Sequence, residues 1–435
     1  MKICIISREL IKPSSPTPHH LKTHKLSLLD QLAPDNYFPT ILYYSQTNKN
    51  SVNCSDHLKK SFSKTLTDYY PLAGRFKDDS FIDCDDYGAT FIEARVAGDM
   101  SDVFKLSDVD LLEQLLPCDV NPQKLSVDHS IIAIQVNYFE CGGVAICFCF
   151  RHSVVDATAG ANFIKNWATV ARGGNDIKDV IFDYTSIFPP QDLSHLSKSF
   201  YQVHYSPLTD SVTKRFMFDG TKVAALREEI SKGPCLDRPT RFEAVTALIW
   251  GAVIGATRET DDDFTRPRHV AKVSVNLQKR MNTTIPEHRI GNIYQVTFAD
   301  WPMEKTIDYN SLAGKLRESI TMMNDFYARK LNKGGGLILN YLANLGDDQE
   351  KSKINVFGFS GWCKLPFYEA DFGWGKPLRV STAPKMKNFA VLLDCSDGQG
   401  IEAWIGLSKE DMSKFEKDPN IRAFASFSPS ATCFD

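Results

Sequence analysis

The stretch Val144-Ala-Ile-Cys-Phe-Cys-Phe150, followed after one arginine by His152-Ser-Val-Val-Asp156, decides how this chain is interpreted. Its unbroken apolar run predicts a buried β-strand, because a strand covered on both faces shows no polar alternation. A helix is predicted over 157–172, where Gly173-Gly174 ends it. His152 therefore lies where a buried strand ends and a helix is about to begin. At such a place, side chains project from a rigid edge into a crevice.

Strand and helix patterns alternate over most of the remaining chain, which favours an α/β fold class. Thr240-Arg-Phe-Glu243 matches a capping box, in which the threonine accepts from the backbone and the glutamate reaches back. Further helices are predicted over 56–70 and 311–331, and strands over 38–45, 80–85, 90–96, 132–136, 214–219, 269–277, 388–395 and 401–407.

A length of 435 residues exceeds what one hydrophobic core usually serves, so two domains are expected. The predicted boundaries are 1–187 and 209–435, joined by a crossover over 188–208 that has little periodicity. A segment near 360–385 is expected to pack with the N-terminal domain. The formal net charge of -3 gives no reason to expect nucleic acid or an anionic membrane as a partner.

The eleven cysteines do not have the spacing of a disulfide framework or of a metal site. Cys147 and Cys149 both fall in the buried strand and are interpreted as small apolar residues. The apolar run at the N-terminus is too short for a signal peptide, and no segment has the roughly 18 apolar residues of a membrane helix. We therefore expect a reduced, cytoplasmic protein without a metal. Two self-sufficient domains give no reason to require a partner, so a monomer is expected.

His152 and Asp156 are the first candidates for chemistry. An imidazole with an ordinary pKa near 6.5 accepts a proton at neutral pH and returns it. Correct placement of such a base contributes about 10²–10⁴ in rate. The spacing alone leaves a second interpretation open, in which His152 is a core or helix-capping residue. Asp156 invites a relay interpretation, in which it orients the imidazole.

A second motif, Asp371-Phe-Gly-Trp-Gly375, follows about half a chain later. Its Asp-Phe-Gly triplet is not accompanied by the other motifs of a protein kinase. Together the two motifs resemble the plant BAHD acyltransferases, which move an acyl group from coenzyme A to an alcohol or amine. The resemblance extends over nearly the whole chain through Tyr69-Tyr-Pro-Leu-Ala-Gly-Arg75, Gly291-Asn292 and Ser360-Gly-Trp362.

The resemblance implies an α/β, two-domain, coenzyme A-dependent acyltransferase fold (chloramphenicol acetyltransferase-like) with a central channel between the domains. It implies that His152 is the general base in a ternary complex, without an acyl-enzyme. Asp371 is named beside it as a second catalytic residue. The loop that Asp371 opens is expected to be mainly structural, through Gly373, Trp374 and Gly375.

The same resemblance assigns roles to further residues. Ser360 and Trp362 are expected to face the tetrahedral intermediate, as a pair of donors aimed at a developing oxyanion would. Asp156 is expected to point away from the site and to pair with Arg280. The Gly291-Asn292 pair is interpreted as a close approach of backbone to ligand. Predicted contacts with coenzyme A are Thr240 and Arg241 for phosphate, and Ser274, Val275 and Asn276 for the pantetheine.

Four positions depart from the family pattern. Close relatives read Ser-His-Lys around the base, whereas this chain has Arg151 and Ser153, so altered affinity for coenzyme A or the acceptor is expected. Gln278 replaces an arginine of the Asp156-partner segment. Gly361 replaces a serine of the family's Thr-Ser-Trp.

The N-terminal run Lys12-Pro-Ser-Ser-Pro-Thr-Pro18 resembles the branch that contains vinorine synthase and the alkaloid O-acetyltransferases. That branch implies transfer of acetyl from acetyl-CoA, as co-substrate, to a hydroxyl of a plant alkaloid such as a monoterpenoid indole alkaloid. The alternatives are malonyl-CoA as donor, a non-alkaloid alcohol as acceptor, or a catalytically silent alkaloid-binding scaffold. A hydrolase is disfavoured because no Gly-x-Ser-x-Gly elbow is present.

Overall fold

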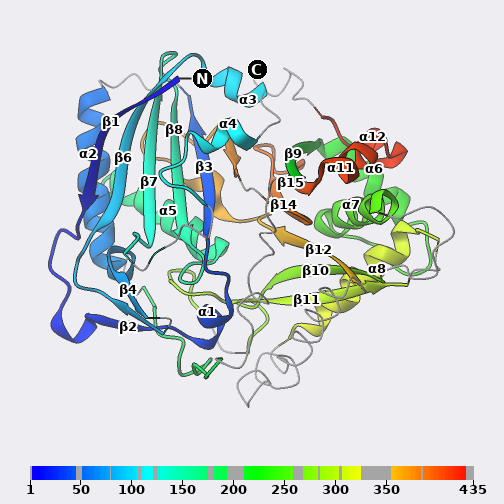
Figure 1. Cartoon of the computed structure of the whole chain (residues 1–435), viewed down its shortest axis with the longest axis horizontal. Coiled ribbons are helices and arrows are strands. Elements are labelled where there is room, and N and C mark those ends of the chain that lie inside the picture. Colours follow the sequence, from blue (N-terminus) through cyan, green and yellow to red (C-terminus); the bar gives the residue numbers. More distant parts are fainter. Residues whose placement is uncertain are drawn as a thin grey trace. The chain divides into compact units, whose positions relative to one another are not determined.

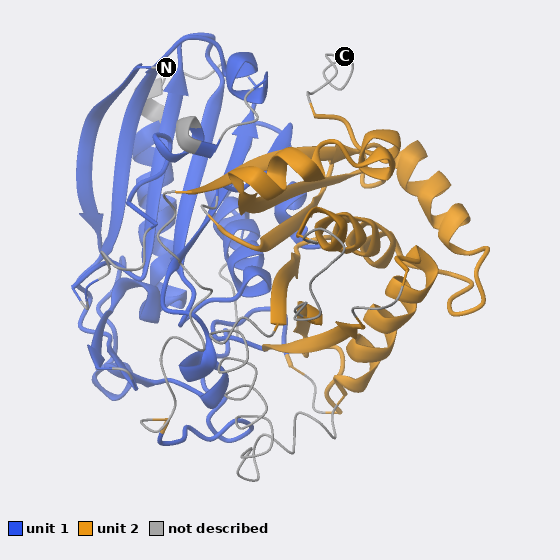
Figure 2. Cartoon of the chain, turned by 45° about the vertical axis from the view of Figure 1, so that its right-hand side comes forward, with its two compact units in different colours: residues 1–192, 286–293, 365–384 blue, residues 193–285, 294–364, 385–435 orange. Residues whose placement is uncertain are grey.

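The chain divides into two compact units, which Figure 2 shows in different colours. Unit 1 comprises Met1–Asp192, Pro286–Ile293 and Leu365–Pro384, and unit 2 comprises Leu193–Ile285, Tyr294–Lys364 and Lys385–Asp435. The computed structural model describes residues 2–45, 51–78, 80–105, 109–120, 126, 128–174, 180–193, 210–257, 268–282, 285–302, 306–324, 354–383 and 386–427.

The predicted domains are continuous in sequence, whereas the units are not. Pro286–Ile293, inside the predicted C-terminal domain, belongs to unit 1. Leu365–Pro384 also belongs to unit 1, and it overlaps the segment near 360–385. Most of the predicted crossover, from 194 to 208, lies outside the described residues.

Unit 1 is built on a six-stranded sheet with the order β1-β6-β7-β8-β3-β13 and a three-stranded sheet with the order β2-β5-β4 (Figure 1). The strands are β1 (Lys2–Ile11), β2 (Thr23–Lys25), β3 (Tyr37–Tyr44), β4 (Arg75–Asp78), β5 (Phe81–Asp83), β6 (Ala89–Ala97), β7 (Ile132–Phe139), β8 (Val144–Arg151) and β13 (Arg379–Ser381). The helices are η1 (His19–Leu21), α1 (Leu28–Leu32), α2 (Ser51–Asp68), η2 (Tyr70–Ala73), α3 (Met100–Lys105), α4 (Val109–Glu113), α5 (Ala157–Ala171) and η6 (Pro366–Glu369).

Strand β8 is buried along its whole length, as its apolar sequence predicts. It pairs antiparallel with β7 on one side and with β3 on the other. Helix α5 packs closely on these strands, because a Cβ added to Gly160 would lie 3.3 Å from the ring of Phe150 and 3.5 Å from that of Phe38. The predicted strand-to-helix transition at His152 is therefore confirmed and lies in a tightly packed part of unit 1.

Unit 2 is built on a six-stranded sheet with the order β11-β10-β12-β14-β15-β9. Its strands are β9 (Ser211–Phe218), β10 (Arg268–Asn276), β11 (Tyr294–Trp301), β12 (Ile354–Gly361), β14 (Phe389–Asp394) and β15 (Ile401–Ser408). Its helices are α6 (Gly220–Ile230), α7 (Arg241–Thr257), α8 (Tyr309–Met322), α11 (Lys409–Phe415) and α12 (Pro419–Phe424), and α7 contacts the other four.

The helix predicted over 311–331 ends earlier than its sequence pattern suggests. Helix α8 begins after Asp308, whose carboxylate caps it, and ends at Met322. Met323 has a ψ of 76°, which is not helical. Residues 325–331 of the prediction lie outside the described part of the chain.

Candidate functional site

His152 lies in the turn that connects β8 to α5, and main-chain and side-chain contacts hold it from two sides. Its backbone N–H donates to the carbonyl of Asn36, 2.8 Å away. Its own carbonyl accepts from Nδ2 of Asn292, also at 2.8 Å. The imidazole packs edge-on against Phe38, with 5.1 Å between the ring centroids. The orientation of the ring is thus set by the packing around the turn.

The imidazole is held mainly in its neutral form. Burial lowers the pKa of His152 below the ordinary value of 6.5, although the charge of Asp156 acts in the opposite direction. A neutral imidazole has a lone pair that can take a proton at neutral pH. These properties are those of a general base.

Asp156 is the N-cap of α5, and the chain itself supplies its hydrogen-bond donors. Oδ1 accepts from the backbone N–H of Ala159 at 2.7 Å, and Oδ2 accepts from that of Ile293 at 2.8 Å. Nη2 of Arg289 donates to both oxygens, at 3.1 and 2.8 Å. This ion pair is buried, since the Arg289 side chain is 0% exposed and that of Asp156 is 6% exposed. The contacts favour the structural interpretation of Asp156 over the relay interpretation.

The prediction that Arg280 pairs with Asp156 is wrong. Arg280 instead donates to the carbonyls of Ile320 and Met323, at 3.0 and 3.5 Å, where helix α8 ends. A cation at this place satisfies carbonyls that have no partner within the helix. The true partner is Arg289, which precedes the Gly291-Asn292 pair. Sequence reasoning missed it because the partner segment was identified by its resemblance rather than by its position in the fold.

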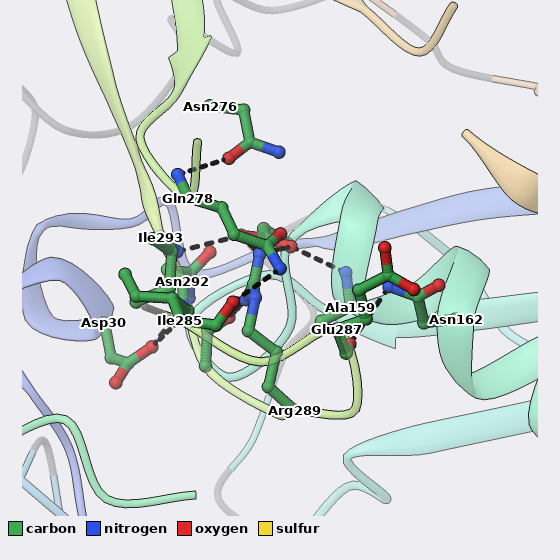
Figure 3. A network of polar contacts seen from close by, with 12 residues as sticks. Asp30, Ala159, Asn162, Asn276, Gln278, Ile285, Glu287, Arg289, Asn292 and Ile293 are labelled. Atoms are coloured by element: carbon green, nitrogen blue, oxygen red, sulfur yellow. Dashed lines mark hydrogen bonds and ion pairs between the residues drawn. The ribbon is translucent and has the colours of Figure 1, made fainter. Parts of the chain in front are cut away.

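Segment Pro286–Ile293 contacts the His152–Asp156 turn at several points, and Figure 3 shows its residues Arg289, Asn292 and Ile293. Gly291, at φ +110°, donates its N–H to the carbonyl of Val154. Asn292 donates its backbone N–H and its Nδ2 to the buried carboxylate of Asp30, at 2.7 and 2.9 Å. Gly291-Asn292 therefore approaches the turn that carries His152, and its observed contacts are with the protein chain. Asp30 is another residue that the sequence analysis did not single out.

Both residues that flank His152 contact one carboxylate, that of Asp35. Arg151 is buried and donates from Nε and Nη2 to the two oxygens of Asp35, at 2.7 and 2.9 Å. Ser153 donates its hydroxyl to the same Asp35, at 3.0 Å. The positive charge of Arg151 is therefore paired within unit 1. Arg151 and Ser153, which depart from the family pattern, therefore stabilise the turn through Asp35.

Asp371 organises its own loop. Its Oδ1 accepts from the backbone N–H groups of Gly373, Trp374 and Gly375, at 2.7, 3.1 and 3.0 Å. Its Oδ2 lies 3.4 Å from Nη1 of Arg172, at the end of α5. Burial opposes ionisation of this carboxyl, but the three N–H groups and Arg172 outweigh it, so the pKa lies below the ordinary value of 3.8.

Two aromatic residues fix this loop to unit 1. Trp374 and Phe372 both pack edge-on against Tyr44 of β3, at 5.5 and 5.9 Å between centroids. Gly373 and Gly375 have φ of +95° and +96°, which side chains other than glycine rarely adopt. These contacts are structural and agree with the expectation for Gly373, Trp374 and Gly375.

In unit 2, strands β10 and β12 separate next to the residues predicted to contact the pantetheine and the oxyanion. Their parallel ladder ends at Val273 and Phe359. Beyond it, β10 continues through 274–276 and pairs with β11, whereas β12 continues through 360–361 and pairs with β14. We call this separation the strand split. Ser274, Val275 and Asn276 lie on one side of the split, and Ser360 and Gly361 lie on the other.

Ser360 and Trp362 contact each other. The indole Nε1–H of Trp362 donates to Oγ of Ser360, at 3.2 Å, which leaves the hydroxyl proton to donate elsewhere. Gly361 turns to the opposite face, where an added Cβ would lie 2.7 Å from the ring of Phe242. The departure at Gly361 is thus explained by the close approach of α7.

The groups predicted to bind phosphate already have partners within the chain. Thr240 donates its N–H and its hydroxyl to the carboxylate of Glu243, at 2.7 and 2.8 Å, which confirms the capping box. Arg241 donates from Nη2 to Asp394, at 2.9 Å, and from Nη1 to the carbonyl of Gln399. A phosphate at this helix end would have to compete with these contacts.

The described residues also bear on the expectations for cysteines, metal ligands and membrane helices. Nine of the cysteines have side chains that the structure describes; these are free thiols, and Cys147 and Cys149 among them are fully buried, as predicted. The described residues hold no cluster of three or more His, Cys, Asp or Glu that could bind a metal ion. Within the same ranges, none of the helices has the length and apolar character needed to span a membrane.

Known proteins match the chain from end to end. A model of the Transferase family matches residues 1–421. Limonoid 21-O-acetyltransferase from Citrus sinensis is 48% identical over 432 residues, which cover 99% of this chain and 100% of that protein. Stemmadenine O-acetyltransferase from Catharanthus roseus is 38% identical over 423 residues, which cover 95% and 96%. The crystal structure of vinorine synthase has a TM-score of 0.83 at 33% identity and covers 98% of this chain and 99% of that one.

Proposed function

Since the chain belongs to the Transferase family of BAHD acyltransferases, we propose that it acetylates a hydroxyl of a limonoid-type alcohol, with His152 as general base. The family model and the acetyltransferase relatives give the reaction class: the chain is an acyl-CoA-dependent O-acetyltransferase. Its predicted α/β acyltransferase fold is confirmed by the likeness to vinorine synthase. The acceptor and the residue roles belong to the proposal.

The observation that carries the proposal is the environment of His152. The neutral imidazole takes the proton from the acceptor hydroxyl as its oxygen attacks the carbonyl carbon of the thioester. A carbon–oxygen bond forms, the carbon–sulfur bond breaks, and the thiolate recovers the proton from His152. A thiol pKa near 8.5 makes the thiolate a good leaving group. The lowered pKa of His152 supports this role, because the base must be unprotonated before attack.

Ser360 and Trp362 are proposed to stabilise the oxyanion. The contact between them supports this role, because it orients the hydroxyl of Ser360 while leaving its proton available. Because the indole N–H of Trp362 is used in this contact, Ser360 is the proposed donor to the oxyanion and Trp362 the residue that positions it. One such donor in a low-dielectric site contributes about 3 kcal/mol to catalysis. Asp371 is proposed to act through the shape of its loop, since Oδ1 is occupied by three backbone N–H groups. Ser274, Val275 and Asn276 remain the proposed pantetheine contacts, and Thr240 and Arg241 the proposed phosphate contacts.

We choose between the two proposed acceptors by the sequence identity of this chain to relatives that act on each of them. The limonoid acetyltransferase is 48% identical to this chain, whereas the stemmadenine acetyltransferase is 38% identical. We therefore favour a limonoid-type alcohol over the alkaloid that the N-terminal resemblance suggests. An alkaloid remains the second candidate, because stemmadenine O-acetyltransferase and vinorine synthase also match nearly the whole chain.

The test is a mass-spectrometric screen of the purified protein with acetyl-CoA and malonyl-CoA against limonoid and alkaloid alcohols, with released thiol measured in parallel. We expect acetyl transfer to a limonoid alcohol. His152→Ala should lower kcat/KM at least 10²-fold. His20→Ala, the same change at an exposed histidine, should leave it within twofold. Undiminished turnover of His152→Ala would refute the base, and no thiol release with any acceptor would indicate a silent scaffold.

We also propose that the enzyme is a cytoplasmic monomer. The free thiols of the described cysteines support a reducing compartment. Light scattering of the purified protein and imaging of a fluorescent fusion test the two statements separately.

A further inference from the structure

Lys272 occupies an unusual place for a lysine, in β10 on the face of the unit 2 sheet that is turned away from the helices. Its partners across the ladders are Phe298 on β11 and Gly358 on β12, and such partners share a face of the sheet. The next residue, Val273, has Thr297 as its partner, whose hydroxyl donates to a carbonyl of α8. Because alternate residues point to opposite faces, Lys272 points away from α8.

The surroundings of Lys272 are apolar. Among the residues that the structure describes, no hydrogen bond or ion pair reaches its ammonium group. By register, the nearest carboxylate of the sheet on this face is Asp300, which pairs with Arg268 at 3.5 Å. Desolvation lowers the pKa of Lys272 to about 8, so the group remains mainly charged at pH 7. The residues beside it by register form an apolar cluster: Val270, Ile354, Phe298 and Val356.

The same face carries the predicted acyl-site hydroxyl. Ser360 lies two residues beyond Gly358, the β12 partner of Lys272. Regular strand spacing would place the Cα atoms of Lys272 and Ser360 about 8 Å apart, and the strand split that begins after Phe359 increases this distance. The flexible stem of a lysine carries its ammonium group well beyond the Cα atom, so this charge can approach the strand split. By contrast, Arg241, one of the two predicted phosphate contacts, is already paired with Asp394.

We propose that Lys272 determines acceptor specificity by excluding alcohols that carry a positive charge and admitting neutral, oxygen-rich ones. This inference rests on the proposed function, in which the reacting carbonyl lies at Ser360. An acceptor whose positive charge lies about 8 Å from the ammonium group would be repelled, at an effective dielectric constant near 20, by an amount that corresponds to roughly 30-fold in affinity. A basic alkaloid is protonated at neutral pH and carries such a charge, whereas a neutral alcohol can accept a hydrogen bond from the ammonium group.

The first experiment uses two alcohols of the same shape, choline and 3,3-dimethylbutan-1-ol, as substrates and as inhibitors of the acetylation found in the screen. The wild type should favour the neutral alcohol by roughly 30-fold. Lys272→Met should remove most of this preference by improving the interaction with choline, and Lys272→Arg should keep it. Lys279→Met, which removes an exposed lysine shortly after β10, serves as the control. An unchanged preference in Lys272→Met would overturn the inference.

The second experiment does not depend on turnover of the two small alcohols. Trace labelling of lysines with deuterated acetic anhydride is followed by mass spectrometry, with and without the acceptor or coenzyme A. The acceptor should protect Lys272 at least fivefold and leave Lys279 unaffected. Protection by coenzyme A alone, or by neither ligand, would overturn the inference. The proposed function is judged separately, because it fails only when no alcohol is acetylated, whatever Lys272 does.

Discussion

The change Asp156→Asn separates a relay aspartate from a structural one. The new amide group must replace one carboxylate oxygen, and either choice places a donor against donors. At Oδ2 it would face Nη2 of Arg289 and the N–H of Ile293, both at 2.8 Å. At Oδ1 it would face the N–H of Ala159 at 2.7 Å. Asparagine therefore leaves at least one donor facing a donor, and it cannot neutralise the charge of Arg289, whose side chain is 0% exposed.

Breaking a buried ion pair by neutralising one partner costs about 3–5 kcal/mol. We therefore expect Asp156→Asn to lower the free energy of unfolding by about 3–5 kcal/mol, and the Tm of unit 1 by roughly 6–20 °C. Arg289→Met should cost a similar amount. The double variant should cost less than the sum of the two single changes, because no unpaired charge remains. Asp85→Asn removes an exposed carboxylate that pairs with Lys22, and it should leave the free energy of unfolding nearly unchanged, because water screens this pair.

Activity decides between the two roles. In serine proteases, loss of the relay aspartate costs about 10⁴ in kcat. Here the protein chain supplies the donors of the Asp156 carboxylate, so kcat per folded molecule should fall less than tenfold. The assay is kcat at a temperature where circular dichroism shows wild type and variant fully folded. A loss of 10³-fold or more in a variant that unfolds like the wild type would refute the structural role.

Three other changes follow from the site. Because burial lowers the pKa of His152, kcat/KM should decline only as the pH falls below 6.5, and a decline centred above that value would contradict the neutral base. Gly361→Ser should lower the free energy of unfolding by about 1–3 kcal/mol, because the added Cβ would lie 2.7 Å from the ring of Phe242. Thermal unfolding should show that the additional change Phe242→Leu restores part of this stability. Asp371→Ala should cost about 1–3 kcal/mol in urea unfolding, because three N–H groups lose their acceptor, while kcat stays within tenfold. A loss of kcat beyond 10³-fold without a loss of stability would make Asp371 catalytic.

Much of the architecture could be predicted because it depends on local patterns. The apolar run of β8, the helix after it and the capping box at Thr240 each need only neighbouring residues to take their form. The position of His152 between a strand and a helix was predictable for the same reason. The end of α8 at Met322 was not, because the apolar pattern continues beyond it.

Partners distant in sequence could not be derived in this way. Arg289, Asp30 and Asp35 meet the His152–Asp156 turn only because separate segments of unit 1 fold onto it. Nothing in the sequence distinguishes Arg289 from Arg280 as the partner of Asp156, since both are arginines near a segment that resembles the family.

The sequence by itself determined many of the strands and helices, the resemblance to the family and the residue expected to move the proton. Periodicity, capping and motif composition are properties of consecutive residues, so the chain carries them before it folds. Only the tertiary structure decided which arginine neutralises Asp156, where β10 and β12 separate, and that Lys272 shares a face of the sheet with Phe298 and Gly358. The physical reason is that ion pairing and desolvation depend on distance through space, which the order of residues does not specify.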